Sequence, residues 1–131
     1  LYKKKHDLWS YYNILGNKIL VENYLNGRLD GESIYYYPNG TISESQMYSN
    51  GMKNGSSKIF YSSGNINMSG NYLNDKLHGT ALFYFNTDTI QLESKGFYYF
   101  GLKDSTWFFY DERGEVVSID RYSKGKLLNS E

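Results

Sequence analysis

Cysteine is absent from this 131-residue chain, which excludes disulfide frameworks, thiolate zinc sites, iron–sulfur clusters and a cysteine nucleophile. Alanine, the best helix former, occurs once, as Ala81, so a helical protein is not expected. No apolar run approaches the roughly 20 residues that a membrane helix needs. Lys plus Arg and Asp plus Glu both number 14. The zero net charge argues against a nucleic-acid binder driven by bulk charge and does not favour an anionic membrane surface.

The abundant residues favour strands and turns. Fifteen tyrosines and seven phenylalanines supply most of the aromatic side chains, and these residue types are enriched in strands. Thirteen glycines favour turns that need a positive φ. Composition therefore predicts an all-β chain of one domain's length.

A repeat of about 24 residues runs along the chain, a period typical of stacked repeats that bury a shared stripe. Tyrosines recur at a nearly constant interval, slightly longer before the fourth, as Tyr24, Tyr48, Tyr72, Tyr98 and Tyr122. The aliphatic residues in register with them are Ile42, Ile66, Ile90 and Val116. We divide the single repeat domain, residues 1–131, into a partial unit at 7–22, units at 23–46, 47–70, 71–95 and 96–120, and a half-unit at 121–131.

Each unit is predicted to form two strands joined by tight turns. Hairpins are predicted to turn at 38–40, 62–64, 86–88 and 112–114, where Gly or, in the third unit, Asp88 can take a left-handed backbone. Asn-Gly at 26–27 and 50–51 and Asn-Asp at 74–75 predict the second turn of each unit. The predicted fold is an elongated, twisted antiparallel sheet of tandem β-hairpins.

Strand alternation predicts one apolar face. Ile42 and Tyr48 share one side of their strand, and the later units repeat this placement. We expect the aliphatic and tyrosine residues to form a continuous row, with its middle used by the fold itself. The opposite face is mostly Ser, Thr, Asn and charged residues.

Candidates for catalysis or metal binding are few. His6, in the basic cluster formed with Lys3, Lys4 and Lys5, and His78 are both interpreted as surface residues. Asp111-Glu112 is the one adjacent acidic pair and is predicted to lie in a solvated hairpin turn. A phosphate-binding loop ending in Lys-Ser or Lys-Thr is missing. We therefore predict no catalytic residue, no metal and no cofactor, and we do not expect an enzyme.

The repeat resembles the variant MORN repeat of bacterial proteins. The segments that carry the resemblance are YLNGRLDGESIYYYPNGTI, YSNGMKNGSSKIFYSSGNI, YLNDKLHGTALFYFNTDTI and YFGLKDSTWFFYDERGEV, and it extends from Trp9 to Leu128. The resemblance implies a β-hairpin array with a protein-binding role and, for the YwqK-type proteins, an antitoxin or immunity-like role. Asp75, Asp88, Ser105 and a two-residue insertion between Ile90 and Tyr98 depart from the pattern.

Three functions stay open: a non-catalytic protein-binding module, a structural or cell-envelope scaffold that self-associates, and a lipid-surface binder. We expect a protein partner of unknown identity, no nucleic acid, and no membrane contact through this segment. Because the first residue is Leu rather than Met, we expect a fragment or a processed form. The compartment stays open between cytoplasm and envelope.

The aromatic surplus suggests where a partner binds, since Tyr and Trp are enriched in protein interfaces. The predicted partner-binding residues are Trp107, Tyr35, Tyr37, Tyr61, Phe83, Phe85 and Phe109. Trp107 is the foremost candidate because Trp is enriched at interface hot spots. The alternative is that Trp107 packs within the core.

Overall fold

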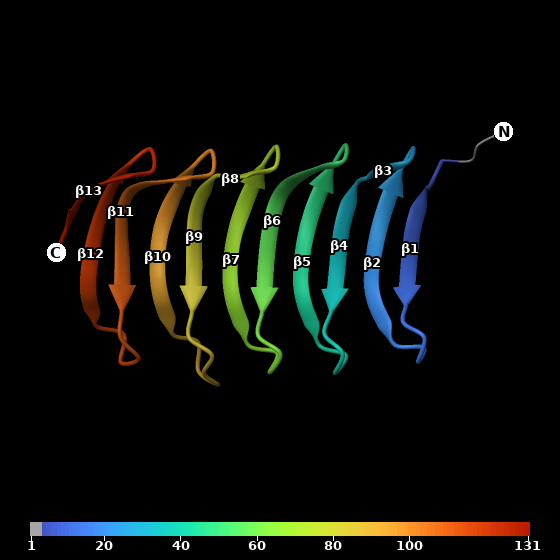
Figure 1. Ribbon diagram of the computed structural model, residues 1–131, viewed down its shortest axis with the longest axis horizontal. Helices are drawn as coiled ribbons and strands as arrows, with labels where there is room; N and C mark the ends of the chain where they lie inside the picture. The colour runs from blue at the N-terminus through green and yellow to red at the C-terminus, as the bar shows by residue number, and fades with distance from the viewer. Residues whose placement is uncertain (1–3) are drawn as a thin grey trace.

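The computed structural model describes residues 4–131, so Lys3 of the basic cluster lies outside the described residues. These residues form thirteen antiparallel strands in one open sheet and no helix, which confirms the all-β hairpin array (Figure 1). The strands are β1 (Asp7–Tyr12), β2 (Lys18–Leu25), β3 (Arg28–Leu29), β4 (Gly31–Tyr36), β5 (Ile42–Ser49), β6 (Met52–Phe60), β7 (Ile66–Leu73), β8 (Lys76–Leu77), β9 (Gly79–Tyr84), β10 (Leu92–Tyr99), β11 (Leu102–Tyr110), β12 (Val116–Ser123) and β13 (Lys126–Ser130).

The strands follow one another across the sheet in chain order, with the N-terminus at one end and the C-terminus at the other (Figure 1). The short strands β3 and β8 pair with β2 and β7 respectively. They are the first parts of strands interrupted at Asp30 and His78, whereas β6 and β11 are continuous. Neighbouring units therefore alternate between an interrupted and a continuous first strand.

The tight turns form the two long edges of the sheet. The upper edge in Figure 1 holds the turns at 26–27, 50–51, 74–75, 100–101 and 124–125, in which both central residues have positive φ. The lower edge holds the predicted turns at 38–40, 62–64 and 112–114. In these turns Gly40, Gly64 and Gly114 adopt φ of 90°, 95° and 85°. The amide of Gly40 donates to the carbonyl of Tyr37 at 2.9 Å, as the hairpin geometry requires.

The third lower-edge turn departs from the prediction. Asp88 does not adopt the left-handed conformation, and the loop closes further along the chain, where the amide of Phe85 donates to the carbonyl of Gln91 at 3.0 Å. The two inserted residues lie within this loop. Leu92 therefore pairs with Tyr84 as Ile66 pairs with Phe60, while Ile90 lies in the enlarged turn and is 78% exposed. The prediction that Ile90 belongs to the aliphatic row is wrong.

Three parallel rows of side chains cross one face of the sheet, which we call the inner face. The tyrosine row, near the upper edge, holds Tyr24, Tyr48, Tyr72, Tyr98 and Tyr122. The middle row holds Trp9, Glu22, Ser33, Gln46, Ser57, Gly70, Ala81, Gly96, Trp107 and Asp120. The lower row holds Tyr11, Leu20, Tyr35, Glu44, Ile59, Met68, Phe83, Ser94, Phe109 and Ser118.

The middle row forms the core of this single-layer sheet. Ser33, Gln46 and Ala81 are almost completely buried, although residues 4–131 form this one sheet and no second layer over it. Their side chains are short or polar, so the larger side chains of the tyrosine row and the lower row can cover them from both sides. By contrast Ile42 and Val116, predicted to lie in the apolar row, are 37% and 49% exposed. β-Bulges beside both residues interrupt the simple alternation.

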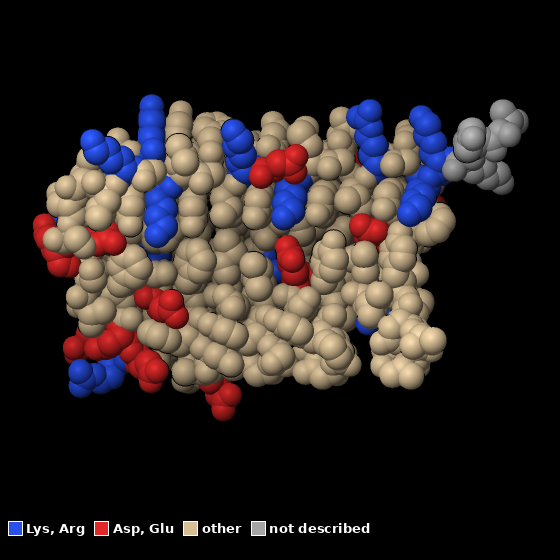
Figure 2. All heavy atoms as spheres, viewed as in Figure 1, with Lys and Arg blue, Asp and Glu red and all other residues tan. Residues whose placement is uncertain are grey.

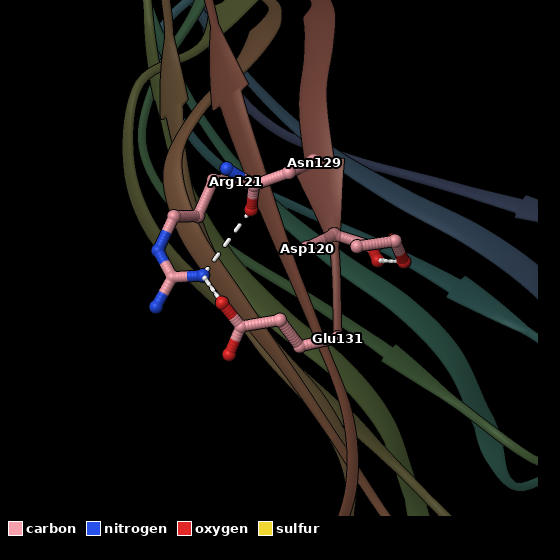
Figure 3. Close-up of polar contacts among 5 residues, drawn as sticks. Asp120, Arg121, Asn129 and Glu131 are labelled. Carbon is pink, nitrogen blue, oxygen red and sulfur yellow. Dashed lines mark hydrogen bonds and ion pairs between the residues drawn. The ribbon is translucent and has the colours of Figure 1, made fainter.

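Polar contacts attach the last strand to the sheet (Figure 3). Nη1 of Arg121 in β12 lies 2.7 Å from Oε1 of Glu131 and donates to Oδ1 of Asn129 at 3.2 Å. On β13, the hydroxyl of Ser130 donates to the Asp120 carboxylate. Because these hydrogen bonds are exposed to solvent, they position the strand more than they stabilise the fold.

The residues that the structure describes include no helix long and apolar enough to cross a membrane.

Candidate functional site

Trp107 lies in the core and is not an exposed anchor. Only 2% of it is exposed, because its ring lies over Gly96 of the neighbouring strand, where a Cβ atom would stand 1.9 Å from Cδ2 of the indole. The rings of Phe83, Tyr98 and Tyr122 surround it, with centroids 6.1, 5.1 and 6.4 Å away. Its Nε1 donates to the carbonyl of Phe97 at 3.2 Å. Trp107 therefore packs within the core, which was the alternative prediction, and it is not an exposed interface residue.

Two more of the predicted residues connect successive units. The hydroxyl of Tyr37 donates to the carbonyl of Phe60 at 2.5 Å, and that of Tyr61 donates to the carbonyl of Tyr84 at 2.7 Å. Phe85 occupies the equivalent place in the third unit and has no hydroxyl to donate. The polar tips of Tyr37 and Tyr61 are thus engaged within the sheet, at the lower edge.

The remaining predicted residues lie on the inner face. Tyr35, Phe83 and Phe109 all belong to the lower row. Phe83 and Phe109 are half-buried, whereas Tyr35 is 38% exposed. The structure therefore separates the seven predicted residues into the core, the lower edge and the lower row, and does not bring them together into one patch.

An exposed aromatic cluster at the upper edge was not predicted from the sequence. Phe100 has φ of 43° in a turn where the first three units have Asn26, Asn50 and Asn74. A left-handed backbone is unfavourable for a bulky residue and costs about 1–3 kcal/mol. Phe100 is nevertheless 43% exposed. The signal was present in the sequence, as a Phe-Gly at the position of the Asn-Gly turns.

His78 orders this cluster from the neighbouring unit. Its ring lies 4.4 Å from that of Phe100, and its Nδ1 accepts the Phe100 amide at 3.2 Å. Tyr99 packs edge-on against Phe100 at 4.9 Å, and Leu102 follows the turn. Tyr99 and Leu102 are 40% and 48% exposed. We call Tyr99, Phe100 and Leu102 the Phe100 patch.

Basic side chains surround the patch along the upper edge. Figure 2 shows Lys and Arg gathered there, while acidic groups gather toward the C-terminal part of the lower edge. The basic residues near the upper edge are Lys4, Lys5, Arg28, Lys53, Lys76, Lys103, Lys124 and Lys126. Within residues 4–131 none of them forms a salt bridge with an acidic side chain. The neutral chain therefore presents a basic edge.

The acidic residues of this edge bind backbone amides. Carboxylates of Asp30, Asp75 and Asp104 accept the amides of Asn50, Lys53 and Lys124 at 3.3, 2.8 and 2.9 Å. The hydrogen bond from the Lys124 amide lowers the pKa of Asp104. These carboxylates therefore connect one unit to the next.

Within the described residues, no group of three His, Asp or Glu side chains is placed to hold a metal ion. The acidic pair at 111–112 does lie in a hairpin turn. There the Asp111 carboxylate accepts the amides of Arg113 and Glu115 at 2.9 and 3.0 Å, and these hydrogen bonds lower its pKa.

Comparison with known families identifies two of the units. Residues 29–50 and 53–74 each match the MORN repeat variant. The second match follows the first at the spacing that separates Tyr24 from Tyr48 in the tyrosine row, and the two matches support the MORN repeat family for this chain. Repeats of this family are generally binding modules, which is consistent with a non-catalytic repeat protein. No curated protein matches the sequence.

Proposed function

We propose that this chain is a non-catalytic protein-binding module and that the Phe100 patch is its contact surface. The observation that carries the proposal is Phe100 itself, an exposed aromatic residue in a left-handed turn where Asn would fit without strain. Strained residues persist where the surrounding structure holds them and are concentrated at functional sites. Here the His78 ring and its hydrogen bond to the Phe100 amide hold the residue in place.

The surroundings of the patch define the chemistry of the partner. Lys76, Lys124 and Lys126 lie at the same edge and carry no ion pair with an acidic side chain of the described chain. The ammonium of Lys124 lies 5.5 Å from the centroid of the Tyr99 ring. A partner protein with an apolar pocket bordered by Asp or Glu complements this arrangement, because aromatic anchors supply affinity and charges at the rim steer association. Neutralisation of a toxin, the role that the YwqK-type resemblance implies, is one form of such binding.

The proposal is tested by capture with matched variants. Phe100→Asn restores the residue that other turns use, so we expect it to keep or raise the melting temperature while removing the aromatic anchor. Ile90→Ser is the control, since Ile90 is equally apolar, more exposed, and lies at the opposite edge. Immobilised protein and the Ile90→Ser variant should retain the same partner from an extract of the source cells, and Phe100→Asn should lose it.

Equal capture of the partner by Phe100→Asn and by the parent protein would refute the proposal that the Phe100 patch is the contact surface. Sedimentation with anionic liposomes that depends on Phe100 would instead favour a lipid surface over a protein partner. Both variants are first checked by circular dichroism for retained β-structure, so that a lost interaction is not confused with unfolding.

A further inference from the structure

The N-terminal part of the inner face has a run of buried polar residues in its middle row, which we call the polar floor. Between β2 and β5, the middle row consists of Glu22, Ser33 and Gln46, all buried. After Ser57 the same row continues as Gly70, Ala81 and Gly96, and the Trp107 ring fills the space above Gly96. The two parts of one repeated framework therefore have different chemistry.

Two buried acceptor atoms of this floor have no hydrogen-bond partner. They are Oγ of Ser33 and Oε1 of Gln46, on residues that are 1% and 0% exposed. The two residues face each other across β4 and β5. An unsatisfied buried polar atom is costly, and its presence in a native structure calls for an explanation such as a ligand.

Carboxylates and tyrosine rings surround these two atoms. Glu22 is buried beside them and accepts the Tyr24 hydroxyl at 3.0 Å. Glu44 pairs with Tyr35 in the lower row, and Tyr48 lies on the same strand as Gln46. Burial raises the pKa of both Tyr35 and Tyr48, and the negative charges of Glu22 and Glu44 raise it further. Neither carboxylate takes part in a salt bridge among the described residues.

The tyrosine row already binds ammonium groups at alternate positions. Nζ of Lys5 lies 4.9 Å from the centroid of the Tyr24 ring, Nζ of Lys53 lies 4.9 Å from that of Tyr72, and Nζ of Lys103 lies 5.3 Å from that of Tyr122. In all three pairs the lysine precedes its tyrosine at the same spacing in the sequence.

The residue at that spacing before Tyr48 is Leu29, and within residues 4–131 no lysine or arginine lies over the Tyr48 ring. Tyr48 thus lies in the row beside the two unsatisfied acceptors and is influenced by the charges of Glu22 and Glu44, yet it has no cation of its own.

We propose that the inner face around Glu22, Ser33, Gln46 and Tyr48 binds an alkylammonium group from outside the chain. The carboxylates supply the opposite charge, and the Tyr35 and Tyr48 rings present their negative faces to it. The Ser33 and Gln46 oxygens, which the surrounding side chains cover, accept its N–H donors once the tyrosine side chains above them turn aside. The group is the end of a lysine side chain of a partner or a free amine, since both present the same chemistry. This site is distinct from the Phe100 patch and does not depend on it.

The test measures binding of small probes by backbone amide NMR shifts. The probes are n-butylammonium, N-acetyl-lysine-N-methylamide and, as an uncharged control, 1-butanol. We expect saturable shifts in β2, β4 and β5 with the two ammonium probes and none with 1-butanol. Tighter binding of the lysine derivative identifies a lysine side chain as the source, and equal binding identifies a free amine.

Two variants and a matched control test whether Glu22 and the unoccupied position over the Tyr48 ring account for ammonium binding. Glu22→Gln should weaken binding about tenfold or more, since it removes a charge-assisted hydrogen bond at nearly constant shape. Leu29→Lys supplies an internal ammonium at the position that lysine occupies before Tyr24, Tyr72 and Tyr122, and it should abolish binding. Leu77→Lys makes the same change in the unit that precedes Tyr98, where the middle row is apolar, and should leave binding unchanged.

The proposal is overturned if the ammonium probes give no saturable shifts, if 1-butanol gives the same shifts, or if Glu22→Gln binds as tightly as the parent. Loss of binding in Leu77→Lys as well as Leu29→Lys would also overturn it, because the effect would then be one of general charge. Thermal melts of each variant confirm that it is folded, and Glu22→Gln decides the result if Leu29→Lys does not fold.

Discussion

Adding one methyl group at Gly96 should destabilise the sheet far more than adding one at Gly70. Both glycines lie in the buried middle row and neither has a positive φ. A Cβ atom on Gly96 would lie 1.9, 2.1 and 2.5 Å from Cδ2, Cε2 and Cε3 of Trp107. Because a normal carbon contact is about 3.5 Å, the indole would have to move by roughly 1.5 Å.

The indole has little freedom to move by that much. The rings of Phe83, Tyr98 and Tyr122 surround it, and its Nε1 is hydrogen-bonded to the carbonyl of Phe97. We expect Gly96→Ala to cost about 2–3 kcal/mol as overpacking. The upper limit is the roughly 3–5 kcal/mol expected for complete loss of the ring in Trp107→Ala.

Urea denaturation measures the effect, through the midpoint at unchanged slope. Gly70→Ala is the control, since its nearest neighbour is the flexible end of Met68, with Cε 3.0 Å away, and it should cost less than about 1 kcal/mol. In a Trp107→Ala background the cost of Gly96→Ala should disappear, because the methyl then enters the space that the ring has left. Equal effects at the two glycines, or an unchanged cost of Gly96→Ala in that background, would refute the packing argument.

Three further predictions concern the turns and the titrating groups. Gly40→Val and Gly64→Val should each cost about 1–3 kcal/mol from backbone strain alone, since no atom lies within 4 Å of the added Cβ at either site; urea midpoints equal to the parent would contradict this. Burial and the hydrogen bond to Glu22 raise the pKa of Tyr24. The contribution of the neutral Tyr24 hydroxyl to folding stability is therefore complete below the ordinary tyrosine pKa of about 10 and is lost as pH rises through the raised pKa. Absorbance titration of tyrosinate should therefore lose its last-titrating phenol in Tyr24→Phe. The hydrogen bond from the Lys124 amide lowers the pKa of Asp104. The contribution of the Asp104 carboxylate to folding stability is therefore present above the ordinary pKa of 3.8 and is lost as pH falls through the lowered pKa. Asp104→Asn should flatten the fall in stability on acidification, and an unchanged dependence of stability on pH would argue against this role.

The sequence alone determined the local structure of this protein. Turn residues act through their own backbone preferences, so glycine at 40, 64 and 114 was sufficient to locate three lower-edge hairpins. The regular spacing of the tyrosines likewise determined the repeat and the order of the strands, because each hairpin pairs with its neighbour in the chain.

Only the tertiary structure decided which side chains are buried and where the candidate sites lie. Trp107 is in the core because Gly96, on the neighbouring strand, leaves room for its ring, and a single-strand pattern carries no information about that space. The inserted residues entered the 86–91 loop, so Leu92 rather than Ile90 kept the register. The unsatisfied oxygens of Ser33 and Gln46 became visible only once three strands were side by side, because burial and hydrogen bonding depend on neighbours that sequence periodicity does not specify.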